Sequence, residues 1–275
     1  MSALEPDTIG TAQPLAARET FNGVAALYDQ MRPGYPSAVF DRVTSIAGLN
    51  QRSRLLEVGC GTGHATFEFA RHGLAIDCIE LGENMAALAR QRLAEFPRVS
   101  ITVTDFDLWT TPSRYNLIYI ATAYHWLNQQ TRVARLASLL EPGGRLAVWR
   151  NHHARTNGAS SEFYAAAQKV YLRIAPELVH KFGGLLTPEA IPQPEKDEWQ
   201  ASGLFTDVQT HTWLWSRDYT ASEYAQMLAT HSNHQMLDEH TRAALLNRLA
   251  RLVDDFGGQV TSEYVTLLHM ARKPG

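Results

Sequence analysis

Short apolar runs alternate along this chain with longer segments in which apolar residues recur every three or four positions. The runs predict strands and the recurring segments predict helices, because side chains repeat every two positions along a strand and about every 3.6 along a helix. The predicted strands are 54–58, 75–80, 99–104, 116–121, 145–149, 208–215 and 264–271, and the predicted helices are 37–47, 64–73, 85–93, 133–140, 160–174, 196–202, 221–228 and 245–253.

Strand and helix alternate regularly as far as residue 149. Such alternation is typical of an α/β fold, a doubly wound and mostly parallel sheet with helices on both faces, which binds ligands at the carboxyl ends of its strands. The alternation breaks at 151–207, a stretch longer than one crossover connection requires, so we expect a helical cap insertion there. Residues 1–20 lack periodicity and predict a flexible tail or lid, which leaves 21–275 as one domain.

A glycine-rich turn links the first predicted strand to the following helix. The run is Arg54-Leu-Leu-Glu-Val-Gly-Cys-Gly-Thr-Gly-His64. Gly59 and Gly61 let a ligand approach the backbone, and Gly63 lets the helix pack closely, with its N–H groups facing the ligand. The spacing is G-x-G-x-G, which departs from the G-x-G-x-x-G of dinucleotide binders. A tight strand-to-helix turn without a ligand is the alternative interpretation.

Acidic residues end the next two predicted strands. Glu80 lies about 20 residues after the glycines, where an acid can accept hydrogen bonds from both hydroxyls of a ribose. Asp105 and Phe106 follow the third strand and offer an adenine one acceptor and one aromatic face. Each residue alone is compatible with a solvated strand end or a turn, but three successive strand ends together predict an adenosine site.

In these motifs the chain resembles the class I S-adenosylmethionine-dependent methyltransferases, and the resemblance covers roughly residues 20–150. The motifs, in order, are Leu56-Glu-Val-Gly-Cys-Gly-Thr-Gly63, Glu80-Leu-Gly-Glu-Asn-Met85, Asp105-Phe106, Tyr115-Asn-Leu-Ile-Tyr-Ile-Ala-Thr-Ala-Tyr-His-Trp126 and Leu140-Glu-Pro-Gly-Gly-Arg-Leu146. The resemblance implies a seven-stranded Rossmann-like sheet whose last two strands form an antiparallel edge pair.

The resemblance also implies the cofactor, S-adenosyl-L-methionine, and the residues around it. Glu57 and the glycines lie near its methionine half, Glu80 binds the ribose, and Asp105 and Phe106 hold the adenine. Ala121 to His125 border the reaction site. The full set expected to bind the cofactor is Tyr28, Arg32, Glu57, Gly59, Gly61, Glu80, Asn84, Met85, Asp105, Phe106, Ala121 and His125.

Composition narrows the substrate class. The net charge of −3 gives no basic field for nucleic acid, so we expect a small-molecule substrate. The chain has neither a run of about 18 apolar residues nor the pattern of a signal peptide, which predicts a cytoplasmic protein that does not enter a membrane, as monomer or homodimer.

Cys60 and Cys78 fall in apolar surroundings and predict buried thiols. His231 and His234 lack companion ligands, so we expect no metal.

Candidate catalytic residues come from two segments. Tyr28 to Pro36 is dense in aromatic and cationic residues and resembles the segment that folds over the methionine end of the cofactor in small-molecule members of the family. Tyr28, Arg32 and Tyr35 then bind the cofactor carboxylate, face the sulfonium or touch the substrate, unless the segment is only a surface turn. His125 follows the fourth strand and acts in catalysis or merely fixes the loop.

Methyl transfer to a small molecule, most simply a carboxylic acid that becomes a methyl ester, is the leading functional prediction. Within the family, the motifs look most like those of the subgroup that contains trans-aconitate methyltransferase. Alternatives are methylation of an O, N or C atom of a natural product, a nicotinamide-dependent oxidoreductase, and a non-catalytic module that binds the cofactor. The residues expected to bind the acceptor are Tyr35, Trp126, Arg150, His152 and His231.

Overall fold

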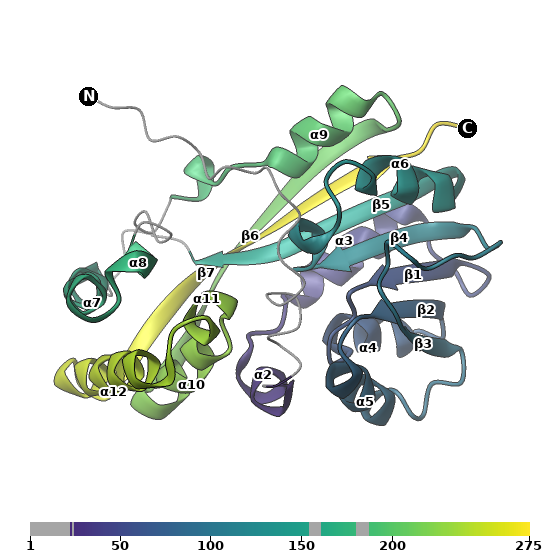
Figure 1. The fold of residues 1–275 in the computed structure, drawn as a ribbon. Helices are drawn as coiled ribbons and strands as arrows, with labels where there is room; N and C mark the ends of the chain where they lie inside the picture. Colours follow the sequence, from purple (N-terminus) through teal and green to yellow (C-terminus); the bar gives the residue numbers. More distant parts are fainter. Residues whose placement is uncertain (1–22, 24, 154–160, 180–186) are drawn as a thin grey trace.

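A computed structural model describes Gly23 and residues 25–153, 161–179 and 187–275 (Figure 1). The predicted tail or lid at 1–20 therefore lies outside the described residues. No helix within the described ranges is long and apolar enough to cross a membrane.

One seven-stranded sheet forms the centre of the fold, in the order β3-β2-β1-β4-β5-β7-β6. Neighbouring strands from β3 to β5 run parallel, whereas β7 runs antiparallel to both β5 and β6. The predicted mostly parallel, doubly wound sheet is confirmed, and its antiparallel strand lies between β5 and the edge strand β6. The strands are β1 (Arg54–Val58), β2 (Ala75–Glu80), β3 (Val99–Val103), β4 (Tyr115–Ala121), β5 (Leu140–His153), β6 (Thr206–Thr220) and β7 (Gln259–Arg272).

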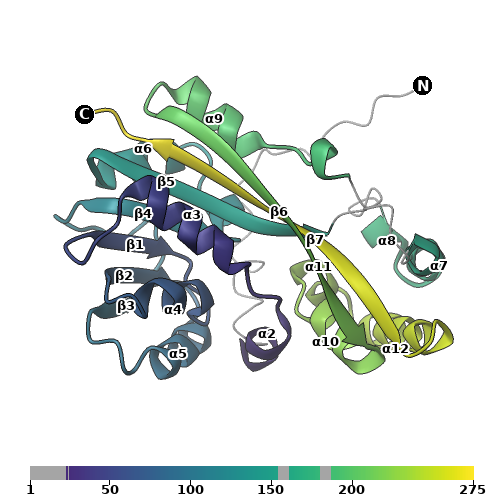
Figure 2. The same cartoon turned by 180° about the vertical axis from the view of Figure 1, so that it is seen from behind.

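Helices cover both faces of this sheet (Figures 1 and 2). One face buries apolar side chains against α3 (Ser37–Ala47), α4 (His64–Ala70) and α5 (Glu83–Arg92), and the other against α6 (Arg132–Leu139) and α9 (Pro194–Ser202). Successive strand residues serve opposite faces, as Leu55 and Leu56 do, so parallel strands buried on both sides read as continuous apolar runs. Serine is a common N-cap residue, which favours Ser37 as the cap of the predicted helix, but Ser37 is the first residue of α3 and Pro36 is its N-cap.

Strands β6 and β7 extend beyond the rest of the sheet, and a second group of helices packs around their far ends (Figure 1). A capping box of Thr220 and Glu223 starts one of them. The helix predicted over 221–228 ends at Ala229, and a separate short helix follows it. This group consists of α7 (Ser161–Ile174), α8 (Pro176–Val179), α10 (Ala221–Ala229), α11 (Ser232–Gln235) and α12 (Glu239–Asp255).

The expected cap insertion at 151–207 is thus divided between two places. Its first helices, α7 and α8, share a buried core with the C-terminal helices α10 and α12. Its last helix, α9, packs on the sheet through Trp199, which is fully buried. The group around the far ends of β6 and β7 therefore combines residues from before and after β6.

Candidate active site

A pocket of about 1070 Å³, counting the part open to solvent, lies at the carboxyl ends of β1, β2 and β4. The order of strands reverses between β1 and β4, which is where doubly wound sheets bind their ligands. Ten of the residues singled out from the sequence line this pocket. They are Tyr28, Arg32, Gly59, Gly61, Glu80, Met85, Phe106, Ala121, His125 and Trp126.

Glu80 is held at the pocket by the loops on either side of it. Its two carboxylate oxygens accept hydrogen bonds from the backbone N–H groups of Gly61 and Gly82, each at 2.8 Å. Phe106 is buried at the same wall of the pocket, with the Arg135 guanidinium 4.8 Å from its ring centre. The carboxylate is thereby fixed in one orientation before any ligand arrives.

The glycine turn needs its glycines for packing as well as for access. All three have positive φ, 74° at Gly59, 56° at Gly61 and 83° at Gly63. A Cβ atom on Gly59 would lie 2.6 Å from Cβ of Ala123, and one on Gly63 would lie 3.0 Å from Cδ1 of Leu93. Gly59 therefore lets the turn after β4 approach, and Gly63 lets α4 pack against α5, as predicted.

Helix α2 (Ala25–Met31) carries the aromatic and cationic segment to the pocket. Asp29 pairs with Arg92 at 3.0 Å and with His64 at 3.1 Å, which ties α2 to α5 and α4. Arg32 donates from Nη2 to the carbonyl of Thr230 at 3.0 Å, and its guanidinium lies 5.1 Å from the ring centre of Tyr28. Tyr28 and Arg32 consequently face the pocket, which excludes the surface-turn interpretation for these two residues.

His125 lies in a single 3₁₀ turn, η2 (Tyr124–Trp126), directly after β4. Burial, together with the positive charges of Arg150, Arg132 and Arg32, lowers the pKa of His125 to about 3. The imidazole is therefore neutral at pH 7. A neutral imidazole can donate or accept a hydrogen bond, but with so low a pKa it is a weak proton acceptor.

Several expected site residues do not line this pocket. Tyr35 contacts it indirectly, because its hydroxyl bonds at 2.7 Å to Oγ1 of Thr122, a lining residue. The Nε group of Arg150 donates to Nε2 of His152 at 2.9 Å, and both residues line a separate small hollow of about 180 Å³. His231 is half-buried beside His153, with ring centres 5.9 Å apart.

Three expected cofactor residues also lie outside the pocket lining. Glu57 is buried in the sheet, where its carboxylate accepts from Thr66 and Tyr119, and burial raises its pKa to about 7. Asp105 accepts from the backbone N–H of Asp107 at 2.9 Å, and Asn84 is exposed near the start of α5. Glu57 and Asp105 thus shape the strand ends next to the pocket.

Nine further lining residues complete the wall, and four of them fall outside the motifs named above: Ile79, Thr104, Leu127 and Ser232. Ser232 belongs to α11, more than 80 residues beyond Leu146, where the last motif ends, so only the folded chain brings it to the pocket. Leu81, Gly82 and Thr104 follow β2 and β3 directly. The full set is Val58, Ile79, Leu81, Gly82, Thr104, Thr122, Ala123, Leu127 and Ser232.

The two cysteines, Cys60 and Cys78, are buried, as predicted from their apolar surroundings, and both are free thiols. Within the described part of the chain, no group of three or more His, Cys, Asp or Glu side chains is placed to hold a metal ion. The pocket therefore offers carboxylate, aromatic, guanidinium and imidazole groups for binding.

The family of methyltransferase domains matches residues 55–144, the segment that carries the glycine turn, Glu80, Phe106 and His125. Demethylmenaquinone methyltransferase of Tropheryma whipplei is 30% identical over 167 residues, which are 58% of this chain and 67% of that protein. The chain belongs to the class I S-adenosylmethionine-dependent methyltransferases. Trans-aconitate 2-methyltransferase of Mycobacterium tuberculosis is 23% identical to this methyltransferase over 244 residues, 88% of this chain and 85% of that protein.

Solved structures share the fold of this methyltransferase. A putative type II methyltransferase from Anaeromyxobacter dehalogenans superposes with a TM-score of 0.62 at 20% identity, covering 89% of this chain and 99% of that one. The family and fold expected from the motifs are confirmed, and the oxidoreductase interpretation is set aside.

The buried and half-buried histidines predict that acid destabilises this methyltransferase. Burial lowers the pKa of five of them to about 3 or 4, below the usual value near 6.5, so between those values the unfolded chain binds protons that the folded chain does not. Each such histidine lowers the free energy of unfolding by up to about 1.4 kcal/mol per pH unit as the pH falls below 6.5. The five are His125, His152, His153, His234 and His269.

Glu57 has the opposite effect on stability as the pH falls. Its raised pKa lets the folded chain bind a proton before the unfolded chain does, which stabilises the fold, but it is one group against five. Urea unfolding at pH 7 and pH 5 should show a marked loss of stability at pH 5. Replacing buried His269 with Gln should lessen that loss, whereas the same change at exposed His72 should not. Equal stability at both pH values would contradict the prediction.

Proposed function

We propose that this methyltransferase transfers a methyl group to a carboxylate of a small acid and forms a methyl ester. S-adenosylmethionine, the cofactor of the family, supplies an electrophilic methyl group on a sulfonium when bound. The observation that carries the proposal is that the Arg32 guanidinium and a neutral His125 line the same pocket.

The residues of the pocket fit the cofactor. The Glu80 carboxylate is oriented by two backbone N–H groups and is the group that would accept from the ribose hydroxyls. Phe106 and Met85 give the same wall an apolar surface for an adenine. Gly59 and Gly61 leave the backbone open toward the opposite end, where the methionine part would lie.

The state of His125 favours an acceptor that needs no base. A carboxylate is ionised at pH 7 and can attack directly, whereas a phenol, alcohol or amine must lose a proton. With a pKa of about 3, His125 takes up such a proton poorly. As a neutral hydrogen-bond donor it would instead orient one carboxylate oxygen, and orientation supplies much of the rate in a displacement reaction.

With a carboxylate as acceptor, the bonds formed and broken in the reaction are as follows. One acceptor oxygen forms a bond to the methyl carbon while the bond from that carbon to sulfur breaks. The electron pair goes to sulfur, and the products are a methyl ester and S-adenosylhomocysteine, with no proton released. Tyr28, Arg32, His125 and Trp126 would surround the acceptor, and Arg32 would hold its charge.

Replacing Glu80 tests the cofactor site. Glu80→Ala removes an acceptor for both ribose hydroxyls, and losing charge-assisted hydrogen bonds should weaken binding of S-adenosylhomocysteine by about 100-fold. The matched control is Glu83→Gln, on the exposed first turn of α5. Calorimetry that finds wild-type affinity in Glu80→Ala would refute the assignment.

Replacing His125 separates its role in transfer from binding of the cofactor. His125→Ala should lower kcat by about 10- to 100-fold, with affinity for S-adenosylhomocysteine within about threefold of wild type, because the residue faces the acceptor. His72→Ala, an exposed histidine, is the control. Since His125 is already neutral above about pH 3, kcat should show no histidine titration near pH 6.5. An unchanged kcat would leave His125 with a structural role alone.

A panel of dicarboxylic, tricarboxylic and aromatic acids with methyl-labelled cofactor tests the acceptor class. The expected product releases its label as methanol in mild alkali, and Arg32→Gln should raise the KM for the acid, with exposed Arg42→Gln as control. Weaker binding of S-adenosylhomocysteine in Arg32→Gln would assign Arg32 to the cofactor carboxylate instead. A product stable to alkali would show transfer to a phenol, N or C atom and would overturn the ester proposal.

A further inference from the structure

The turn after β4 presents all but one of its residues to the pocket. Residues 121–127 line it except for Tyr124, which is buried on the other side of the turn. The turn is weakly supported by its own backbone, through hydrogen bonds from Trp126 to Ala123 and from Leu127 to Tyr124, and no side chain caps it. Thr122 before it has a φ of 60°, a strained conformation for a β-branched residue that neighbouring structure must hold in place.

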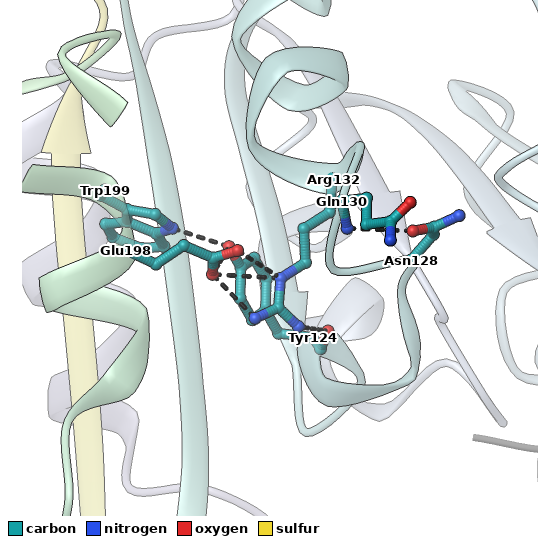
Figure 3. Close-up of polar contacts among 6 residues, drawn as sticks. All are labelled: Tyr124, Asn128, Gln130, Arg132, Glu198 and Trp199. Carbon is teal, nitrogen blue, oxygen red and sulfur yellow. Dashed lines mark hydrogen bonds and ion pairs between the residues drawn. The ribbon is translucent and has the colours of Figure 1, made fainter. Parts of the chain in front are cut away.

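Tyr124 connects this turn to helices α6 and α9 (Figure 3). Its hydroxyl donates to Oε2 of Glu198 at 2.8 Å and accepts from Nε1 of Trp199 at 2.9 Å. Its ring centre lies 4.2 Å from the Arg132 guanidinium, and its backbone carbonyl accepts from Arg132 at 3.2 Å. The ring, the hydroxyl and the backbone carbonyl of Tyr124 therefore each contact α6 or α9.

Arg132 and Glu198 form a two-pronged ion pair behind Tyr124. Nε and Nη2 of Arg132 donate to the carboxylate at 2.9 Å and 2.8 Å, and the two side chains are 7% and 23% exposed. Asn128 holds the segment that leads into α6. Its side-chain oxygen accepts from the backbone N–H of Gln130, and its backbone carbonyl accepts from the backbone N–H of Arg132 (Figure 3). Glu198 comes from α9, so the pair joins two helices to one turn.

A buried ion pair is costly to desolvate and is weak evidence for overall stability, but its geometry is highly specific. Here every donor nitrogen of the Arg132 side chain is directed at Glu198 or at the Tyr124 carbonyl. We propose that Arg132, Glu198 and Tyr124 are positioning residues, which hold the turn so that His125 and Trp126 keep their places in the pocket.

The catalytic consequence rests on the proposed function, because it requires His125 to face the acceptor. The structural consequence does not, since the turn is either held or released whatever the acceptor is. Two variants test whether these contacts hold the turn. Tyr124→Phe removes only the hydroxyl and changes no charge, and Glu198→Gln keeps the shape but weakens the ion pair.

The test measures amide hydrogen exchange at Trp126 and Leu127 and the ring signals of His125 by NMR, all with S-adenosylhomocysteine added. Both variants should exchange these two amides about tenfold faster than wild type, and the His125 signal, assigned through His125→Gln, should shift or broaden. Signals of His72 and His240, which are exposed elsewhere, should stay unchanged.

Asp207→Asn is the matched control, because Asp207 pairs with Arg145 at 2.7 Å and accepts from Gln209 at 2.8 Å, and neither partner lines the pocket. It should leave exchange at Trp126 and Leu127 as in wild type. With an acceptor acid, both test variants should lose about tenfold in kcat and little in KM. Folded variants with wild-type amide exchange at Trp126 and Leu127 and an unchanged His125 signal would overturn the positioning proposal. Failure of the proposed function is distinguishable, because it would appear as no methyl ester from the wild-type enzyme.

Discussion

The site depends on how closely the turn after β4 approaches the glycine turn after β1. A side chain at Gly59 would place its Cβ 2.6 Å from that of Ala123, so only glycine permits the contact. Glu80 then joins the glycine turn to the loop after β2 through the N–H groups of Gly61 and Gly82. Three strand ends are thereby fixed around one pocket at the point where the strand order reverses.

Local patterns predicted the parts of the fold that depend on neighbouring residues. Strand β2 has the bounds expected from its apolar run, and the glycine turn, Glu80 and Phe106 meet at one pocket because parallel strands place their carboxyl ends together. Side chains beyond residue 149 were not predictable in this way. Strand β5 continues to His153, so its residues alternate between faces, and Arg150 and His152 line a small hollow apart from the main pocket.

Contacts distant in sequence were missed for a related reason. Arg132 and Glu198 are 66 residues apart, and only the packing of α9 on the sheet brings them to Tyr124. The charges of this network also act on the site, since Arg132 contributes to keeping His125 neutral. Burial and nearby guanidinium groups together make the pocket better suited to an acceptor that is already ionised than to one that must be deprotonated.

Affinity for S-adenosylhomocysteine in Gly59→Ala tests this account most directly. Gly48→Ala is the control, because Gly48 also has positive φ, 60°, but has open space around it. Both variants should lose about 1–2 kcal/mol of stability from backbone strain. Calorimetry should find binding at least about 100-fold weaker in Gly59→Ala alone, since the new Cβ displaces the turn that forms one wall. Equal, wild-type affinity in both variants would contradict the dependence of the site on this contact.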